Sequence, residues 1–370
     1  MRYYIIAGER SGDLHGSNLV RALRKLDPEA VLRGFGGEYM EQAGVTLKVH
    51  YNEIALMGLL EFIVSLPKMI RYIKRCTDDI AAFKPDVIIL IDYGGFNRRI
   101  AKYGKKQGIK VFYYIPPKIW AWYQRRALEI KANVDKLFVI LPFEKDFYKK
   151  YDWEVDYVGN PVLDAVKAHK PDNTFLEKEK LLHKENIIAL LPGSRRQELK
   201  SILPVMGEVV RAKREYQFVV AAVENLDHEL YSPLAGLPNV TFVYDKTYDL
   251  LQHAKAAIVT SGTATLETAL FRVPQMVVYK PGAFNYWLAK KFIRVAFISL
   301  VNLIADREVV RELIHHEANQ ASMTHELEEL LHGSRREEVL AGYQQVTAAL
   351  EAGGSASENT AKLMWKYLCG

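Results

Sequence analysis

Apolar and polar positions alternate along the chain in a regular rhythm. Short runs rich in Val, Ile and Tyr are followed by longer charged segments with helical spacing, such as Ser17–Leu26. This rhythm is typical of βαβ units, in which parallel strands are covered by helices on both faces. The predicted strands are Tyr3–Ala7, Val87–Asp92, Val111–Ile115, Leu137–Leu141, Ile187–Leu191, Phe218–Ala222, Val240–Val243, Ala256–Thr260 and Gln275–Tyr279. The pattern therefore predicts an α/β protein.

These strands form two series, separated by a polar and charged segment. Ala165–Glu185 lacks strand-like runs and contains the sequence Lys170-Pro171-Asp172-Asn173, which predicts a linker. We therefore expect two Rossmann-like domains, residues 1–165 and 166–345. Ligands of such folds bind at the carboxyl ends of the strands, so a ligand is expected in a cleft between the two domains.

Composition agrees with this picture and removes several classes of protein. The chain has 370 residues, of which 49% are hydrophobic and 25% charged, which excludes disordered, fibrous and polytopic membrane proteins. A net charge of +6 suits anionic ligands or a membrane surface but is too small to indicate nucleic acid. Two cysteines, Cys76 and Cys369, make no disulfide framework or metal spacing, which favours a reducing cytosol. The longest apolar stretch, Ile54–Leu66, is shorter than the about 20 residues that a membrane span needs.

The first predicted strand is followed by a glycine-bearing turn, Gly8–Gly16. Its sequence matches neither a P-loop nor a dinucleotide fingerprint. Glu9, Asp13 and His15 place three titratable groups at the mouth of the expected cleft, where they could do chemistry. The alternative is that Ser11 or Asp13 only caps the next helix.

Two turns of the second domain have features of anion sites. In Leu191–Glu198, Ser194 and Gln197 match a capping box, and Gly193 and two arginines precede a helix N-terminus. A capped surface helix with solvated arginines is the alternative.

In Thr260–Glu267, small hydroxyl residues and Gly262 leave room for a diphosphate. Glu267 could accept hydrogen bonds from a ribose diol, or only compensate the helix dipole. Together the two turns favour a nucleotide-sugar diphosphate.

Other candidate residues allow a functional and a structural interpretation. Asp92 ends the most apolar predicted strand, where it could be a general base or a turn residue. Ile54–Leu66 precedes the basic residues Lys68, Arg71, Lys74 and Arg75, which suits an interfacial helix, an acyl-chain groove or a core helix. The tryptophans Trp120 and Trp122 lie beside arginines and could line a cleft or belong to the core.

Taken together, these short motifs resemble those of the lipid-A-disaccharide synthase family, in order and spacing, from near residue 5 to near residue 350. The matching pieces are Ala7–Asp13, Gly34–Met40, Leu56–Gly58, Trp120–Trp122, Leu141–Lys145, Leu191–Arg195, Ser261–Glu267 and Trp287–Lys290. The resemblance implies a GT-B glycosyltransferase fold, in which the C-terminal helix, about residues 346–370, packs back on the first domain. It also implies an inverting transfer from UDP-2,3-diacylglucosamine to 2,3-diacylglucosamine 1-phosphate (lipid X), which yields a β-1,6 disaccharide phosphate and UDP.

The resemblance also implies roles for individual residues and partners. The UDP site would comprise Gly193, Ser194, Arg195, Ser261, Gly262, Thr263, Ala264, Glu267 and Asn302. The acceptor and its acyl chains would meet Ser11, Met57, Gly58, Trp120 and Trp122. No metal and no cofactor are expected, because helix N-termini and arginines would stabilise the leaving UDP. The family implies a cytoplasmic protein held peripherally at the inner-membrane lipid surface, and a homodimer stays open.

One departure from the family affects the catalytic base. The strand end is commonly I-D-x-P-D-F, and its second Asp is the favoured base, but here Gly95 stands at that position. Asp92 matches the first Asp and is the first substitute, followed by Glu9 and Asp13. Two alternatives stay open: an enzyme like UDP-N-acetylglucosamine 2-epimerase, and a non-catalytic lipid- or nucleotide-binding protein.

Overall fold

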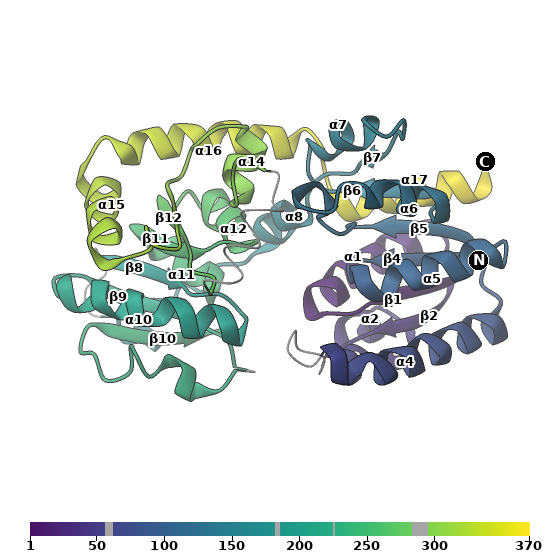
Figure 1. Cartoon of the computed structure of the whole chain (residues 1–370), viewed down its shortest axis with the longest axis horizontal. Helices are drawn as coiled ribbons and strands as arrows, with labels where there is room; N and C mark the ends of the chain where they lie inside the picture. Colours follow the sequence, from purple (N-terminus) through teal and green to yellow (C-terminus); the bar gives the residue numbers. More distant parts are fainter. Residues whose placement is uncertain (56–61, 182–185, 225, 283–294) are drawn as a thin grey trace. The chain divides into compact units, whose positions relative to one another are not determined.

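The computed structural model describes residues 1–55, 62–181, 186–224, 226–282 and 295–370. The chain divides into two compact units. Unit 1 comprises Met1–Pro161 and Ala352–Gly370, and unit 2 comprises Val162–Glu351. Each unit is a parallel sheet with helices packed on it (Figure 1). The α/β class predicted from the strand rhythm is therefore confirmed.

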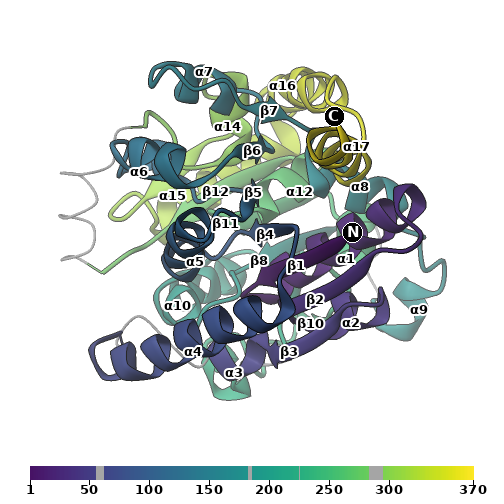
Figure 2. The ribbon, with the colours of Figure 1, turned by 90° about the vertical axis from the view of Figure 1, so that its right-hand side faces the viewer.

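Unit 1 is built on a seven-stranded parallel sheet in the order β3-β2-β1-β4-β5-β6-β7. Strand β4 is apolar and buried at every position, and β1 is buried at every position after Arg2, because both faces of these central strands are covered. One face packs against α1, α2 and the C-terminal helix, and α4, α5 and α6 cover the other (Figure 2). The elements are β1 Arg2–Ala7, α1 Arg10–Leu26, β2 Val31–Gly36, α2 Glu38–Gln42, β3 Thr46–His50, α3 Tyr51–Ala55, α4 Phe62–Phe83, β4 Val87–Ile91, α5 Gly94–Lys106, β5 Lys110–Tyr114, a 3₁₀ turn Ile119–Ala121, α6 Arg126–Asn133, β6 Lys136–Val139, α7 Glu144–Lys149 and β7 Asp156–Tyr157.

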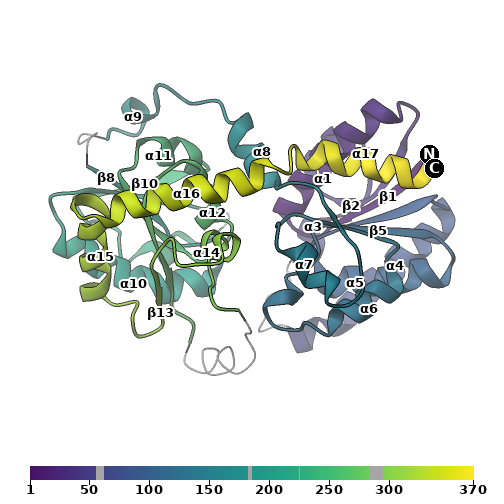
Figure 3. The same cartoon turned by 90° about the horizontal axis from the view of Figure 1, so that it is seen from above.

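The C-terminal segment belongs to unit 1. Helix α17, Ala356–Cys369, lies beside α1 (Figure 3), and its Ala361 and Met364 are fully buried in the unit 1 core. The segment enters through a close backbone contact, where a Cβ on Gly159 would lie 2.4 Å from the carbonyl oxygen of Gly354. Only glycine fits this approach, and Gly159 also has a φ of +94°. Helix α16, Arg335–Glu351, still belongs to unit 2.

Unit 2 has a six-stranded parallel sheet in the order β10-β9-β8-β11-β12-β13. Helices also pack on both faces of this sheet. Helices α10 and α15 contact each other, and residues of α11 and α12 form a separate apolar cluster with Phe175. The elements are α8 Pro161–Ala168, α9 Phe175–Lys178, β8 Ile187–Leu191, α10 Arg196–Ala212, β9 Gln217–Ala222, a 3₁₀ turn His228–Tyr231, β10 Val240–Tyr244, α11 Thr247–His253, β11 Ala256–Thr260, α12 Ala264–Leu270, β12 Gln275–Tyr279, α14 Leu300–Ala305, β13 Glu312–Ile314 and α15 Gln320–His332.

Each sheet has one point at which the strand order reverses direction. In unit 1 this topological switch lies between β1 and β4, and in unit 2 it lies between β8 and β11. Open α/β sheets bind ligands outside the carboxyl ends of the strands at such a switch. The turns that the sequence predicts to be functional directly follow β1, β4, β8 and β11. Each unit therefore has one candidate site, at the carboxyl edge of its sheet beside the switch point.

Two details of the predicted elements are wrong. Helix α1 begins at Arg10, so most of the predicted Gly8–Gly16 turn is helical. Strand β4 ends at Ile91, and Asp92 lies beyond it with a positive φ. None of the helices in the described part of the chain is long and apolar enough to cross a bilayer.

Candidate active-site residues in the two units

A strained elbow follows β4 at the switch point of unit 1. Asp92 and Tyr93 both adopt the left-handed conformation, with φ of 47° and 50°. The Asp92 carbonyl oxygen accepts hydrogen bonds from the Tyr113 hydroxyl at 2.7 Å and from Asn97 Nδ2 at 2.8 Å. Two consecutive strained non-glycine residues persist only where the surroundings hold them, and they are concentrated at functional sites. The elbow thus fixes Asp92 at the carboxyl edge of the sheet.

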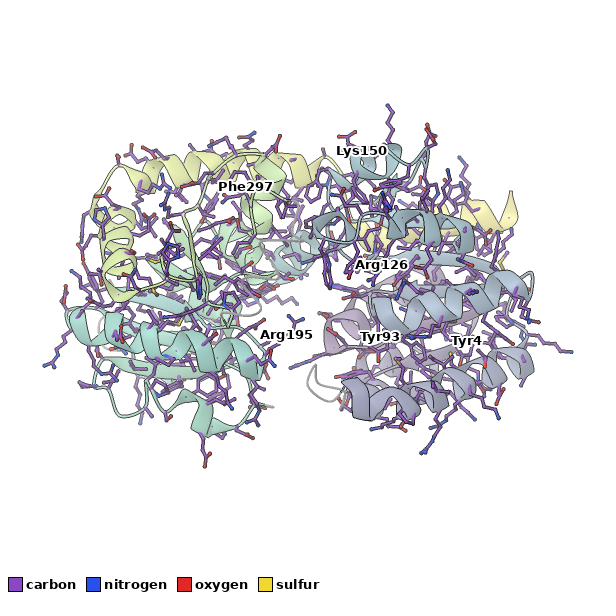
Figure 4. All side chains as sticks on the ribbon, in the orientation of Figure 1. Tyr4, Tyr93, Arg126, Lys150, Arg195 and Phe297 are labelled. Carbon is purple, nitrogen blue, oxygen red and sulfur yellow. The ribbon has the colours of Figure 1, made fainter. Side chains whose placement is uncertain are left out.

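The β1 turn packs directly against this elbow. The Tyr93 ring covers Gly8, where a Cβ would lie 2.2 Å from the ring (Figure 4 labels Tyr93). Glu9 follows as the exposed N-cap residue of α1. The pKa of Tyr93 is raised to about 12, mainly because the tyrosine itself is partly buried and also because the negative charge of Glu9 acts on it. Asp92 and Glu9 therefore both lie near Tyr93, at the carboxyl edge of the sheet. The sequence analysis did not single out Tyr93, because its contact with Gly8 forms only in the folded chain.

Gly95 is exposed in the first turn of α5, and a Cβ placed on it meets no atom of the described residues within 4 Å. The described neighbours therefore leave room for the first side-chain atom of the aspartate that the family resemblance implies at this position.

Asp13 does not have the exposure that a general base needs. Its side chain is fully buried, and its carboxylate accepts hydrogen bonds from the backbone N–H groups of Gly37, Tyr39 and Met40 at 2.7, 3.0 and 3.1 Å. These are the first amides of α2, so Asp13 caps that helix from a distance. We correct its assignment from candidate base to structural anchor. Burial also lowers the pKa of His15 to about 4, so this imidazole is neutral at pH 7.

The two predicted acceptor tryptophans have different environments. Trp120 is buried, its ring meets Phe143 edge-on, and its Nε1 donates to Glu144 Oε1 at 3.2 Å. It therefore belongs to the core of the loop, which corrects its assignment as an acceptor contact. Trp122 is 55% exposed and meets the ring of Tyr123, so it stays a candidate contact for an apolar ligand.

The remaining acceptor candidates are less constrained by the structure. Ser11 is exposed in the first turn of α1. Met57 and Gly58 lie outside the described residues, together with the rest of 56–61 in the predicted apolar segment.

Helix α10 begins next to β8, but its cap differs from the predicted Ser194–Gln197 box. The carboxylate of Glu198 accepts from the backbone N–H groups of Ser194 and Arg195, at 3.2 and 3.3 Å, and pairs with the Arg195 guanidinium at 3.4 Å. Gly193 has a φ of +104°, and a Cβ there would meet Glu198. The Arg195 side chain is 74% exposed at the start of α10 (Figure 4). The amides of this turn therefore already hold a carboxylate of the same chain, and its use as an anion site stays a prediction.

The second turn of unit 2 connects β11 to α12. Ser261 donates its hydroxyl to the Ile298 carbonyl oxygen at 2.9 Å, Gly262 and Ala264 are half-buried and Thr263 is exposed. Glu267 follows within the first turn of α12, half-buried, and accepts from the Tyr248 hydroxyl at 2.8 Å. Burial raises the pKa of Glu267, and the Tyr248 hydrogen bond opposes that rise. The sequence did not single out Tyr248 because it comes from another helix.

Asn302 cannot contact a ligand in this structure. It is fully buried, its Nδ2 donates to the Val310 carbonyl oxygen and to Glu312, and its Oδ1 accepts from the backbone N–H groups of Val309 and Val310. Every hydrogen-bonding position of the amide is filled. We correct its assignment from donor contact to a residue that holds the loop before β13.

The described residues contain no cluster of three or more His, Cys, Asp or Glu side chains that could hold a metal ion. The polar groups at the two edges are carboxylates, backbone amides, hydroxyls and an arginine. Such groups can bind a sugar nucleotide and move a proton.

Comparisons with known proteins show which family the chain belongs to. The family model described as lipid-A-disaccharide synthetase matches residues 3–364. Lipid-A-disaccharide synthases of Syntrophus aciditrophicus and Myxococcus xanthus are 40% and 37% identical to the chain. The first match covers 87% of this chain and 86% of the relative, and the second covers 96% and 95%.

Solved structures share the fold at low sequence identity. The UDP-GlcNAc 2-epimerase of Neisseria meningitidis, bound to UDP-GlcNAc, matches with a TM-score of 0.65 and 14% identity, over 100% of this chain and 99% of that one. The glycotransferase of kitacinnamycin matches with a TM-score of 0.69 and 13% identity, over 99% of both chains. These likenesses show the GT-B-like fold alone, so the epimerase alternative gains no support beyond the fold. The full-length relatives show the activity: the chain belongs to the lipid-A-disaccharide synthase family, as an enzyme that condenses UDP-diacylglucosamine with lipid X.

Proposed function

We propose that unit 2 binds the UDP-sugar donor, unit 1 binds lipid X, and Asp92 is the general base of an inverting transfer. The observation that carries this proposal is the strained elbow that holds Asp92 at the switch point of unit 1. An inverting transfer needs a base for the acceptor hydroxyl and a stabilised leaving group on the opposite face of the sugar.

On the donor side, two turns flank the switch point of unit 2. The Arg195 guanidinium and the amides of Ser194 and Arg195 would meet the diphosphate, together with the turn Ser261–Ala264. Glu267 would accept hydrogen bonds from the ribose hydroxyls. The proposal is supported by the backbone N–H groups of Ser194 and Arg195, which already donate to the carboxylate of Glu198 at the place where a phosphate oxygen would bind.

On the acceptor side, the Asp92 carboxylate would take the proton of the acceptor 6-hydroxyl as its oxygen attacks the donor anomeric carbon. The bond from that carbon to the diphosphate breaks, UDP leaves with the electron pair, and the configuration inverts. Glu9 is the second candidate because it is exposed and its charge acts on Tyr93, the neighbour of Asp92. The burial of Asp13 removes it from this role.

The reaction is tested by supplying detergent-dispersed UDP-2,3-diacylglucosamine with and without lipid X. We expect UDP to be released only when lipid X is present, together with a disaccharide 1-phosphate detected by mass spectrometry. Glu9→Gln should keep turnover within a few-fold of wild type. Conversion of the donor sugar without lipid X would instead indicate an epimerase, and loss of turnover in Glu9→Gln would transfer the base to Glu9.

We further infer a peripheral attachment to the cytoplasmic face of the inner membrane through α4. Ile70 is 58% exposed, and Arg71 and Lys74 are exposed close by on the same helix. A concavity of about 420 Å³ beside them is lined by Lys48, Arg71, Lys74, Arg75, Asp78, Asp79 and Ala82. The start of α4 also reaches the reaction edge, since Arg99 contacts Met69 and donates to the Gly95 carbonyl oxygen. Apolar and basic groups together suit an anionic lipid surface.

Vesicle sedimentation tests this attachment. Arg71→Glu with Lys74→Glu should release the protein from vesicles containing phosphatidylglycerol, whereas Lys102→Glu, a single exposed change on α5, serves as control. Equal binding of both variants would contradict a role for α4. Whether the chain forms a homodimer is tested separately by sedimentation equilibrium.

A further inference from the structure

A pair of side chains on α11 and α12 is tied together at the edge of unit 2. The Tyr248 hydroxyl donates to Glu267 Oε1 at 2.8 Å, and no hydrogen bond to Oε2 is found in the part of the chain that the structure describes. Both side chains are half-buried. A glutamate has three rotatable bonds, so fixing one carboxylate oxygen selects a narrow set of orientations for the other.

Tyr248 is itself held from two sides. Its ring meets the His169 ring edge-on at 5.4 Å between centroids, and the Phe271 ring lies at 5.1 Å. His169 Nε2 lies 3.3 Å from Asp249 Oδ1, and the same oxygen accepts from the backbone N–H of Asp172 at 2.9 Å. The segment that precedes β8 thus fixes the position of the tyrosine. The hydroxyl therefore has little freedom to leave the carboxylate.

This arrangement meets the requirements of a ribose site. A carboxylate with one oxygen anchored can present the second to a vicinal diol, and charged hydrogen bonds of this kind are stronger than neutral ones. Preorganisation lowers the entropy that the ligand must otherwise overcome on binding. The anchor also explains why a half-buried carboxylate is tolerated here, because it keeps a hydrogen-bond donor when the site is empty.

We propose that Tyr248 is a positioning residue that orients Glu267 toward the donor ribose and so sets the preference for ribonucleotides over 2′-deoxyribonucleotides. This inference rests on the proposed donor site, in which Glu267 binds the ribose. Tyr248 touches neither the reacting atoms nor the leaving group in this scheme. Its removal should weaken donor binding without changing the chemical step.

The test is calorimetric titration of UDP and 2′-deoxy-UDP into wild type, Tyr248→Phe and Glu267→Gln. Wild type should prefer UDP by about tenfold, the size expected for one charged hydrogen bond. In Tyr248→Phe the affinity for UDP should fall about three- to tenfold while that for 2′-deoxy-UDP stays constant. In turnover assays the same variant should raise the donor KM and leave kcat unchanged.

A matched control is Tyr216→Phe. The Tyr216 hydroxyl is also hydrogen-bonded to a side chain, at 3.0 Å from His332 Nε2. Tyr216 directly precedes β9, so it lies at the amino edge of the same sheet, away from the proposed donor site at the carboxyl edge. This control should bind both nucleotides like wild type, and thermal unfolding shows that each variant is folded. If Tyr248→Phe weakens both nucleotides equally, the positioning role is overturned. If Glu267→Gln keeps the wild-type preference for UDP, the proposed ribose contact itself fails.

Discussion

Glu144 is a fully enclosed carboxyl group whose ionisation should be visible in the stability of unit 1. It accepts hydrogen bonds from the backbone N–H groups of Ile140 and Leu141 and from Trp120 Nε1, but burial outweighs them and raises its pKa from 4.5 to about 7. The folded state therefore binds this proton more tightly than the unfolded chain. The stabilisation is fully present below pH 4.5 and is lost as pH rises through 7, a change of about 3 kcal/mol.

Replacing Glu144 by Gln should remove this pH dependence. The neutral side chain keeps one carbonyl acceptor, so Glu144→Gln should be less stable than wild type at pH 5 and should approach it at pH 8. Urea unfolding followed by tryptophan fluorescence measures this, because four of the five tryptophans belong to unit 1.

Glu129→Gln is the matched control, since Glu129 lies on the surface with a 51% exposed side chain paired with Arg98. It should change the pH profile by less than 1 kcal/mol. Identical pH profiles for wild type and Glu144→Gln would refute the reasoning, because they would show that Glu144 does not titrate with a raised pKa in the folded protein.

The residues at the carboxyl edges of the two sheets lead to three further predictions. Gly95→Asp should fold like wild type, since its Cβ meets no atom of the described residues within 4 Å, and should restore turnover to Asp92→Asn, as measured by disaccharide formation; no recovery would mean that a carboxylate at 95 cannot serve here. Glu198→Gln should bind UDP about threefold more tightly in calorimetry, because it removes a negative charge from the amides of Ser194 and Arg195; weaker binding would show that the charge is needed to shape the turn. Turnover should persist in excess EDTA if, as proposed, helix N–H groups and Arg195 stabilise the leaving diphosphate; its loss would require a metal in the site.

The alternation of strands and helices is readable from sequence where strands are buried on both faces. β4 and β8 are continuous apolar runs and were predicted. β2 was missed because Gly34 and Gly36 interrupt its apolar pattern. A Cβ on Gly34 would lie 1.8 Å from the Ile5 carbonyl oxygen, so the close packing of β1 on β2 requires this glycine. β3 lies at the edge of its sheet and is mostly polar or half-exposed, which gives a weak strand signal.

The sequence predicts the residues of the candidate site less reliably than it predicts the buried strands. The reason is that residue type does not distinguish a ligand contact from a structural anchor. Asp13 and Asn302 are polar residues in recognisable motifs, but their partners are backbone groups supplied by the folded loops. Those of Asp13 lie 24 to 27 residues along the chain. Glu198 was overlooked beside Gln197 because the register of a helix start shifts easily by one residue. In each of these cases the role of the side chain depends on contacts that form only in the folded chain.

In the proposed mechanism, Asp92 supplies the base that Gly95 cannot. The most direct measurement is kcat for disaccharide formation in Asp92→Asn, compared with Asp86→Asn, which changes an exposed aspartate beside the opposite end of the same strand. We predict that Asp92→Asn loses about 10²- to 10⁴-fold in kcat while Asp86→Asn stays within a few-fold of wild type. Near-full turnover in Asp92→Asn would contradict the account and return the search to Glu9.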